Sequence, residues 1–254
     1  MCVTCGCGTS LVEEGALAPV TRPGETELLQ VEQRLLAKND ELADHVRTSL
    51  AVQGITAVNL MSSPGAGKTS LLERTITEMS ALHPQQQVCV IEGDQETSYD
   101  ADRIRAAGAR AVQVNTGAGC HLDASMVHHA LHDLAPPEDS LLVIENVGNL
   151  VCPALFDLGE RAKVVVISVT EGDDKPEKYP HMFRAADLVV VNKTDLLPYV
   201  DFDVDALTER ARALHPGVEV LPLSVRTGER FDTWLSWLGT LTTRGALHGA
   251  AVGP

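Results

Sequence analysis

The stretch TAVNLMSSPGAGKTS, residues 56–70, indicates the fold class of this 254-residue chain. It begins with an apolar run typical of a buried strand and continues as SSPGAGKTS, residues 62–70. This second part matches the end of the phosphate-loop pattern G-x-x-x-x-G-K-[ST], with Ser62 in place of the first glycine. Gly65 and Gly67 let backbone N–H groups turn toward phosphates, and the dipole of the following helix adds to the attraction. A glycine-rich turn without a ligand is the alternative, which the flanking strand and helix disfavour.

Within this loop, Lys68 is expected to reach the β- and γ-phosphates of a nucleotide and to act in catalysis. The Thr69 hydroxyl is placed to bind Mg²⁺. The loop residues expected to contact the nucleotide are Ser63, Pro64, Gly65, Ala66, Gly67, Lys68, Thr69 and Ser70.

The rest of the chain alternates short apolar runs with amphipathic stretches. Several runs are apolar at successive positions, as expected of strands that are covered on both faces. The stretches between them supply helical crossovers, so the pattern predicts an α/β fold with a mostly parallel sheet. The runs lie at 56–62, 88–92, 109–115, 140–147, 163–169, 187–192 and 218–224.

Helices are predicted at both ends of this pattern. Residues 229–243 suit a closing helix. Residues 25–52 are predicted as a helix because apolar residues recur on one face, namely Leu28, Val31, Leu35, Leu42 and Val46. The expected organisation is a cysteine-bearing arm and linker over 1–24, a helix leading into the domain over 25–54, the nucleotide-binding domain over 55–245 and a flexible tail over 246–254.

Composition excludes several classes of partner. The chain is 44% hydrophobic and 22% charged, as in an ordinary globular protein, and its net charge is −15. Nucleic acids and anionic membrane surfaces are therefore not expected as partners, since both need a basic face. Without a signal peptide or an apolar run of about 18 residues, the expected location is the cytoplasm. The six cysteines are then expected to be thiols or metal ligands rather than disulfides.

The identity of the base is indicated by Asn192-Lys193-Thr194-Asp195, an N-K-x-D motif at the end of an apolar run. The carboxylate of Asp195 can accept from both the ring N1–H and the exocyclic amine of guanine, whereas adenine would leave it unpaired. The later segment that begins with Ser224 and Val225 looks like the last guanine-contacting loop of the same superfamily. We therefore expect GTP rather than ATP.

Acidic residues follow two of the other runs. The second run ends in Glu92-Gly93-Asp94, and the fourth ends in Glu145-Asn146-Val147-Gly148, where a small GTPase carries D-x-x-G. Asp94 and Glu145 are expected to hold Mg²⁺ and to orient the attacking water, with Asp100 as a further candidate. Because no glutamine lies beside E-x-x-G to position that water, slow intrinsic hydrolysis is expected.

A separate metal site is indicated by Cys120, His121 and Cys152, which are ligand types that Zn²⁺ and Ni²⁺ prefer. Three protein ligands leave a site incomplete, and a two-fold axis would complete it with the same residues of a second chain. The alternative is that Cys120 and Cys152 are small apolar core residues. Cys89, inside an apolar run, is assigned to the core, and His128 and His132 to a solvated helix face.

Taken in order, these motifs resemble the HypB family, the hydrogenase nickel-incorporation GTPases of the SIMIBI group of P-loop proteins. The resemblance extends over nearly the whole chain. It is carried by C-x-x-C-G-C, S-x-P-G-x-G-K-T, E-G-D, G-x-x-C-H-L-D-A, E-N-x-G-N-L-V-C-P, G-D-D-K-P-x-K-Y-P and N-K-x-D, which begin at residues 2, 62, 92, 117, 145, 172 and 192.

The resemblance implies a function in metal delivery. Such proteins help to insert Ni²⁺ into the [NiFe]-hydrogenase large subunit, together with a nickel chaperone of the HypA type, and they form homodimers when GTP is bound. Cys120, His121 and Cys152 are implied as the ligands of the domain's metal site. Lys178 would reach the guanine of the neighbouring subunit, and Leu196 and Val200 would pack at the interface.

The resemblance also implies that Cys2, Cys5 and Cys7 form a tight nickel site. Three thiolates, with the N-terminal amine as a fourth donor, suit square-planar Ni²⁺. A zinc knuckle is the alternative, but it needs a fourth side-chain ligand nearby. The chain has no histidine before His45, so nickel storage is not expected.

Two other functions remain open. A related GTPase could mature urease or a cobalamin enzyme, although urease-type relatives carry C-P-H where this chain has Cys152-Pro153-Ala154. Alternatively, the chain could be a metal buffer whose nucleotide site is only structural.

Overall fold

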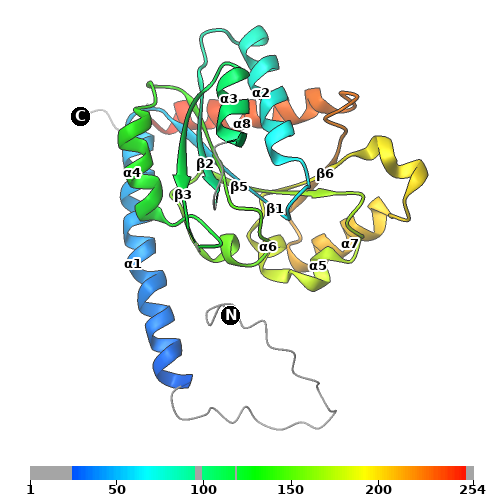
Figure 1. Ribbon diagram of the computed structural model, residues 1–254, viewed down its shortest axis with the longest axis horizontal. Coiled ribbons are helices and arrows are strands. Elements are labelled where there is room, and N and C mark those ends of the chain that lie inside the picture. The colour runs from blue at the N-terminus through cyan, green and yellow to red at the C-terminus, as the bar shows by residue number, and fades with distance from the viewer. Residues whose placement is uncertain (1–24, 95–98, 118, 250–254) are drawn as a thin grey trace.

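The computed structural model describes residues 25–94, 99–117 and 119–249, and Cys2, Cys5 and Cys7 lie outside them. Its centre is a seven-stranded sheet with the order β3-β2-β4-β1-β5-β6-β7 (Figure 1). Every neighbouring pair is parallel, which confirms the predicted α/β fold. The strands are β1 (Thr56–Ser62), β2 (Val88–Asp94), β3 (Arg110–Asn115), β4 (Leu141–Glu145), β5 (Ala162–Ser168), β6 (Leu188–Asn192) and β7 (Glu219–Pro222).

Helices cover both faces of the sheet. Successive residues of a strand point to opposite faces, so the apolar strands present buried side chains to the helices on each side. Val58 and Leu60 join the core under α2, α3 and α8, whereas Ala57 and Met61 face the side of α1, α4, α6 and α7. The α-helices are α1 (Glu25–Val52), α2 (Lys68–Leu82), α3 (Tyr99–Ala106), α4 (Ala124–Leu134), α5 (Lys175–Lys178), α6 (Pro180–Ala185), α7 (Val204–Leu214) and α8 (Phe231–Gly249), with 3-10 turns η1 (Cys152–Leu155) and η2 (Thr194–Tyr199).

The parallel registers bring the functional motifs to one edge of the sheet. β2, β3 and β4 lie on one side of β1 and β5, β6 and β7 lie on the other, so the order of the strands reverses direction at β1. Ligands of open α/β sheets bind outside the carboxyl ends of the strands at such a switch point. The ends of the strands therefore place the phosphate loop, Asp94, Glu145 and Asn192 at the same edge.

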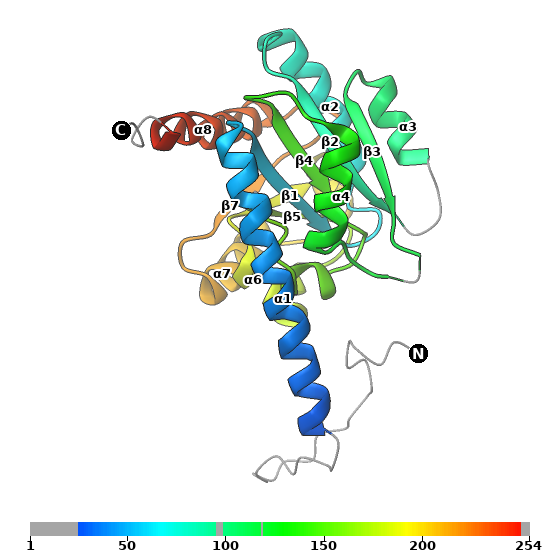
Figure 2. The ribbon, with the colours of Figure 1, turned by 90° about the vertical axis from the view of Figure 1, so that its left-hand side faces the viewer.

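Helix α1 differs from its prediction. Figures 1 and 2 show its second half beside α4. Ala43, Val46 and Leu50 in this half are buried. Its first half continues beyond the body of the domain, and Leu35, predicted on the apolar face, is 57% exposed. The placement of Leu35 was wrong because periodicity shows a common face but not how far the partner surface extends.

Two further features concern the ends of elements. Residues 171–180 contain the short helix α5 and the first residue of α6, and each helix has proline in its first turn. Proline is tolerated there because the first N–H groups of a helix have no intrahelical acceptor. At the other end α8 runs to Gly249, whereas the closing helix was predicted over 229–243. None of the helices in the described ranges is long and apolar enough to cross a bilayer.

Candidate functional site

The phosphate loop joins β1 to α2 and lines a pocket of about 540 Å³ at the carboxyl edge of the sheet. Gly65 and Gly67 have positive φ angles of 77° and 100°, the conformation that glycine adopts without strain. A Cβ on Gly67 would lie 2.6 Å from the Asn192 amide nitrogen, so this turn has no room for another residue. The loop is closed from the other side by Asn192, whose Nδ2 donates to Ala66 O, and by Lys193, whose Nζ donates to Gly65 O.

Lys68 lies buried at the floor of this pocket, with its Nζ donating to Ser62 Oγ at 2.7 Å. Burial lowers the pKa of Lys68, and the nearby carboxylates of Glu145 and Asp100 oppose that effect. Ser62 therefore has a role in this chain that the usual first glycine of the pattern cannot perform, because it orients the lysine.

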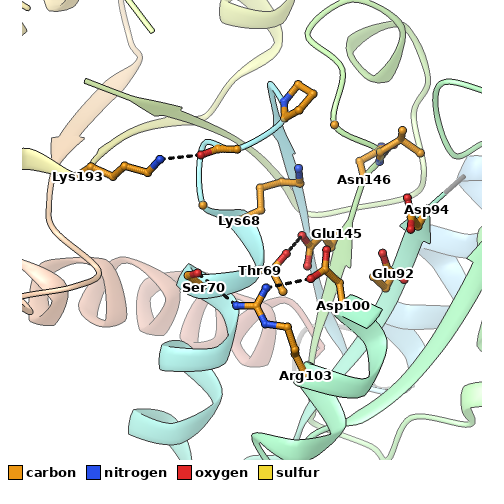
Figure 3. A pocket seen from close by; sticks show the side chains of 16 residues that line it. Lys68, Thr69, Ser70, Glu92, Asp94, Asp100, Arg103, Glu145, Asn146 and Lys193 are labelled. Atoms are coloured by element: carbon orange, nitrogen blue, oxygen red, sulfur yellow. Dashed lines mark hydrogen bonds and ion pairs between the residues drawn. The ribbon is translucent and has the colours of Figure 1, made fainter. Parts of the chain in front are cut away.

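Acidic side chains gather opposite the loop, and Figure 3 shows Glu92, Asp94, Asp100 and Glu145 around the same part of the pocket. Thr69 Oγ1 donates to Glu145 Oε1 at 2.7 Å, so the two expected Mg²⁺ ligands already lie in contact. The second oxygens of Glu92 and Glu145 are buried without a hydrogen-bond partner. Buried carboxylate oxygens without donors are costly unless a cation meets them, so this donor set fits a hard cation such as Mg²⁺.

The electrostatics of this group follow from burial. Burial raises the pKa of Glu145, although Lys68 and the Thr69 hydroxyl oppose the shift. Burial and the negative charges of Glu145 and Asp94 raise the pKa of Glu92 to about 8. A site with so many acidic groups favours a bound cation, since the cation stabilises their ionised forms.

Asp100 also lines the pocket, and its side chain is partly exposed. Arg103 Nη1 donates to Asp100 Oδ1 at 2.9 Å, and its Nη2 donates to Glu73 Oε2 and to Ser70 Oγ. Arg103 thus links α3 to α2, and it carries positive charge beside the phosphate loop.

The predicted guanine end forms one hydrogen-bonded unit next to the loop. Ser224 Oγ donates to Asp195 Oδ1 at 2.6 Å, and Asp195 Oδ2 lies 3.9 Å from the exposed Arg226 Nη1. Asn192 Oδ1 accepts from the N–H groups of Lys193 and Val225. The structure therefore brings together the two segments that the sequence assigned to guanine, although they are about thirty residues apart.

The second site is a cluster of thiols and imidazole. The ligand atoms of Cys120, His121 and Cys152 all lie within 4.8 Å of one another, and the two Sγ atoms are 2.9 Å apart. Burial lowers the pKa of His121, so its ring stays neutral at neutral pH, the form that binds metal. Elsewhere in the described ranges no other group of three potential ligands is this close. Cys89 is fully buried and His128 and His132 are exposed, as predicted.

A polar link connects the nucleotide pocket to this cluster. Asn146 directly follows Glu145 and lines the pocket, and its Oδ1 accepts from Leu122 N at 3.1 Å. Leu122 is the residue after His121. The Asn146 Nδ2 donates in turn to Asn59 Oδ1 in β1. Asn146, just after β4, therefore contacts both β1 and the loop that carries two of the candidate metal ligands.

Some residues of the site were not predicted, and some predicted residues lie elsewhere. Glu92 and Asn146 belong to motifs that the sequence analysis quoted, but nothing in those motifs assigned them a role. Arg103 could have been inferred only from its position one helical turn after Asp100. Ser63 does not line the pocket, because its hydroxyl pairs with Glu171. Lys178 is on the surface in an ion pair with Asp174, outside the pocket of its own chain.

Comparisons with known proteins agree with this geometry. The CobW/HypB/UreG nucleotide-binding domain family matches residues 56–222. Hydrogenase maturation factor HypB of Rhizobium leguminosarum bv. viciae is 54% identical over 234 residues, which is 91% of this chain and 77% of that protein. HypB of Escherichia coli K12 is 50% identical over 239 residues, 91% of this chain and 81% of that protein.

Solved structures agree as well. A crystal structure of HypB from Helicobacter pylori in complex with nickel has a TM-score of 0.75 and 38% identity, and the match covers 82% of this chain and 96% of that one. HypB from Archaeoglobus fulgidus matches with a TM-score of 0.75 and 41% identity over 82% of this chain and all of that one. The order of motifs, the site geometry and these relatives lead to one assignment: the chain belongs to the HypB family of hydrogenase maturation factors.

Proposed function

We propose that this chain is a cytoplasmic, GTP-hydrolysing nickel metallochaperone that helps to insert Ni²⁺ into the large subunit of a [NiFe]-hydrogenase. Its relatives are named as hydrogenase maturation factors, and one of them was solved with nickel. The observation that carries the proposal is the proximity of the Cys120, His121 and Cys152 ligand atoms, joined to the end of β4 through Asn146.

The nucleotide pocket supplies the residues for hydrolysis of GTP to GDP and phosphate. Lys68 supplies positive charge to the β- and γ-phosphates, and Asp195 pairs with the guanine edge. Thr69, Asp94 and Glu145 are the residues that would hold Mg²⁺, which when bound neutralises charge on the phosphate oxygens. Asp94 and Glu145 also orient the attacking water. Intrinsic hydrolysis is slow, because no glutamine accompanies Glu145 in that task.

Coupling between nucleotide and metal follows the chain from Glu145 to Cys152. A displacement of Glu145 on hydrolysis moves the segment that ends at Cys152, and the Asn146 side chain transmits the same displacement to Leu122 beside His121. Nickel and zinc both suit two thiolates and an imidazole, and a homodimer formed with GTP completes the coordination from the second chain.

The partners of this activity are a second copy of the chain, a nickel chaperone of the HypA type and the hydrogenase large subunit. In this proposal Leu196 and Val200 pack at the dimer interface, and Lys178 contacts the guanine of the neighbouring subunit. Cys2, Cys5 and Cys7 form a separate nickel site on the N-terminal arm, with nickel delivered from one site to the other.

The test is a Ni²⁺ titration of the reduced full chain, with and without a non-hydrolysable GTP analogue and Mg²⁺, while mass is followed in the same samples. Two classes of nickel site, the weaker one changed by nucleotide, are expected. A Cys152→Ala variant should lose only the weaker class. If nickel binding is indifferent to nucleotide, the coupling is excluded. If Cys152→Ala leaves the weaker class intact, the cluster is not the metal centre.

A further inference from the structure

The loops that carry the metal ligands are joined by a side chain far away in sequence, Asn39 of α1. Its Oδ1 accepts a hydrogen bond from Ala124 N at 2.9 Å, and its Nδ2 donates to Asp157 O at 2.8 Å. Ala124 follows the Cys120–His121 loop by three residues, and Asp157 follows Cys152 by five. Asn39 is only 9% exposed, so water has little access to these groups, and loss of the two hydrogen bonds would leave buried polar atoms unpaired.

The position of Asn39 is itself held by close packing of α1. Gly159 has a φ of 83°, and a Cβ there would lie 2.8 Å from Ala43 O, so the loop after Asp157 lies directly against the helix. Two turns after Asn39, Arg47 donates from Nη2 to both carboxylate oxygens of Asp157, at 2.7 and 2.5 Å. The helix thus contacts the Asp157 segment through an amide, an ion pair and a glycine.

The segments that Asn39 joins also carry a ring stack beside the ligands. His121 stacks on Phe156 with ring centroids 3.9 Å apart and planes inclined by 21°. Phe156 directly precedes Asp157, the residue whose carbonyl Asn39 binds. Asn39 therefore contacts both of the segments whose rings form this stack.

We propose that Asn39 is a positioning residue of the candidate metal centre, which holds the Cys120–His121 loop and the Cys152 segment at the separation that metal binding requires. The inference rests on the proposed function, since it assumes that these three residues bind metal. Groups that orient metal ligands from the outer layer typically change metal affinity by about 10–100-fold when they are removed. Asn39 acts on the backbone of both ligand-bearing segments, so a similar effect is expected.

The experiment uses the full chain with Cys2, Cys5 and Cys7 replaced by serine, so that the measured Ni²⁺ binding comes from the candidate centre alone. Ni²⁺ affinity is measured under reducing conditions by competition with a chelator, and thiolate-to-nickel absorption identifies the ligands. Asn39→Leu removes both hydrogen bonds in a side chain of similar size. Leu50→Ala is the control, because it truncates a buried residue of the same helix about 16 Å farther along.

Asn39→Leu is expected to weaken Ni²⁺ binding about 10–100-fold and to reduce the charge-transfer absorption. Leu50→Ala is expected to lower the melting temperature and to leave the affinity within about twofold, because distant sites act independently. Asn39→Asp is the milder variant: it keeps an acceptor for Ala124 N, loses the donor to Asp157 O and should also bind nickel less tightly. Affinity for a fluorescent GDP analogue should stay the same in all three.

Two results would overturn the inference, and they are distinct. If both Asn39 variants bind Ni²⁺ as tightly as the parent chain while Cys152→Ala does not, the centre is real but Asn39 does not position it. If the parent chain itself binds no Ni²⁺, or Cys152→Ala binds as well as the parent, the metal centre of the proposed function fails, and the positioning role fails with it.

Discussion

At the scale of single residues, replacing Lys68 distinguishes a GTPase from a metal buffer whose nucleotide site is only structural. Lys68 is a buried cation in the phosphate loop, oriented by Ser62 and facing the acidic side of the pocket. Lys68→Ala is expected to lower the rate of GTP turnover by about 10²–10³, the usual cost of one group that stabilises transition-state charge. Phosphate release measures the effect. Unchanged turnover in this variant would leave the nucleotide site with a structural role only.

Glu92 is expected to make stability depend on pH. Its pKa is raised from about 4.5 to about 8 in the folded chain by burial and by neighbouring carboxylates, so the folded state binds more protons than the unfolded state between these values. The free energy of unfolding should therefore fall as pH rises from about 4.5 through about 8 in protein free of nucleotide and Mg²⁺.

Glu92→Gln should flatten this dependence, because the amide stays neutral throughout. Urea unfolding at pH 6 and pH 8 in the presence of a chelator measures it, with the exposed Glu138→Gln as the matched control. A Glu92→Gln chain that loses as much stability between the two pH values as the parent would show that the carboxyl does not carry the effect.

At the scale of elements, the contact between α1 and the loop before β5 requires a glycine. Gly159→Ala combines a positive φ with overlap against Ala43 O and Val46 Cγ1, both 2.8 Å from the added Cβ. We expect a loss of about 2–4 kcal/mol in the free energy of unfolding, measured with urea. Gly239→Ala in α8 is the control, since a Cβ there meets nothing within 4 Å and should be neutral or stabilising. Equal stability of the two variants would contradict this packing.

The loop between β4 and η1 is expected to carry the coupling between nucleotide and metal. Asn146→Ala removes the hydrogen bond to Leu122 N and should reduce the effect of a GTP analogue on Ni²⁺ affinity, which for typical coupling energies is about 5–150-fold in the parent. Asn149→Ala is the control, because Asn149 lies in the same loop but accepts only from nearby Val151 N among the contacts described. If the GTP analogue changes the Ni²⁺ affinity of Asn146→Ala as much as that of the parent chain, the Asn146 side chain does not transmit the coupling.

At the scale of the whole molecule, the proposed dimer must form against a net charge of −15 on each chain. Like charges repel over about 10 Å at 0.1 M salt, so GTP-dependent dimerisation should strengthen as ionic strength rises. Tyr199, between Leu196 and Val200, is 83% exposed, and Tyr199→Glu should weaken the dimer in sedimentation experiments with a GTP analogue. Leu82→Glu, on the distant end of α2 and 61% exposed, should not. If only Leu82→Glu weakens the dimer, the interface lies elsewhere.

The sequence predicted the elements of the core well, because their signals are local. Buried parallel strands are continuous apolar runs, and each of the seven predicted runs overlaps one strand. The phosphate loop was predicted for the same reason, since glycine, lysine and threonine at fixed spacing impose a backbone turn and a charge. Cys120, His121 and Cys152 were proposed from ligand chemistry, and parallel registers then placed them together.

What the sequence by itself determined was therefore the fold class, the nucleotide loop, the guanine motif and the family. Only the tertiary structure decided which groups act together across the chain. Leu35 has the periodicity of an apolar face but no partner surface to cover. Glu92 has a raised pKa because of its burial and because Glu145, on the neighbouring strand, is negatively charged. Asn39 meets partners 85 and 118 residues away. Such contacts depend on how helices and loops pack, and no local pattern encodes the partner of a single polar side chain.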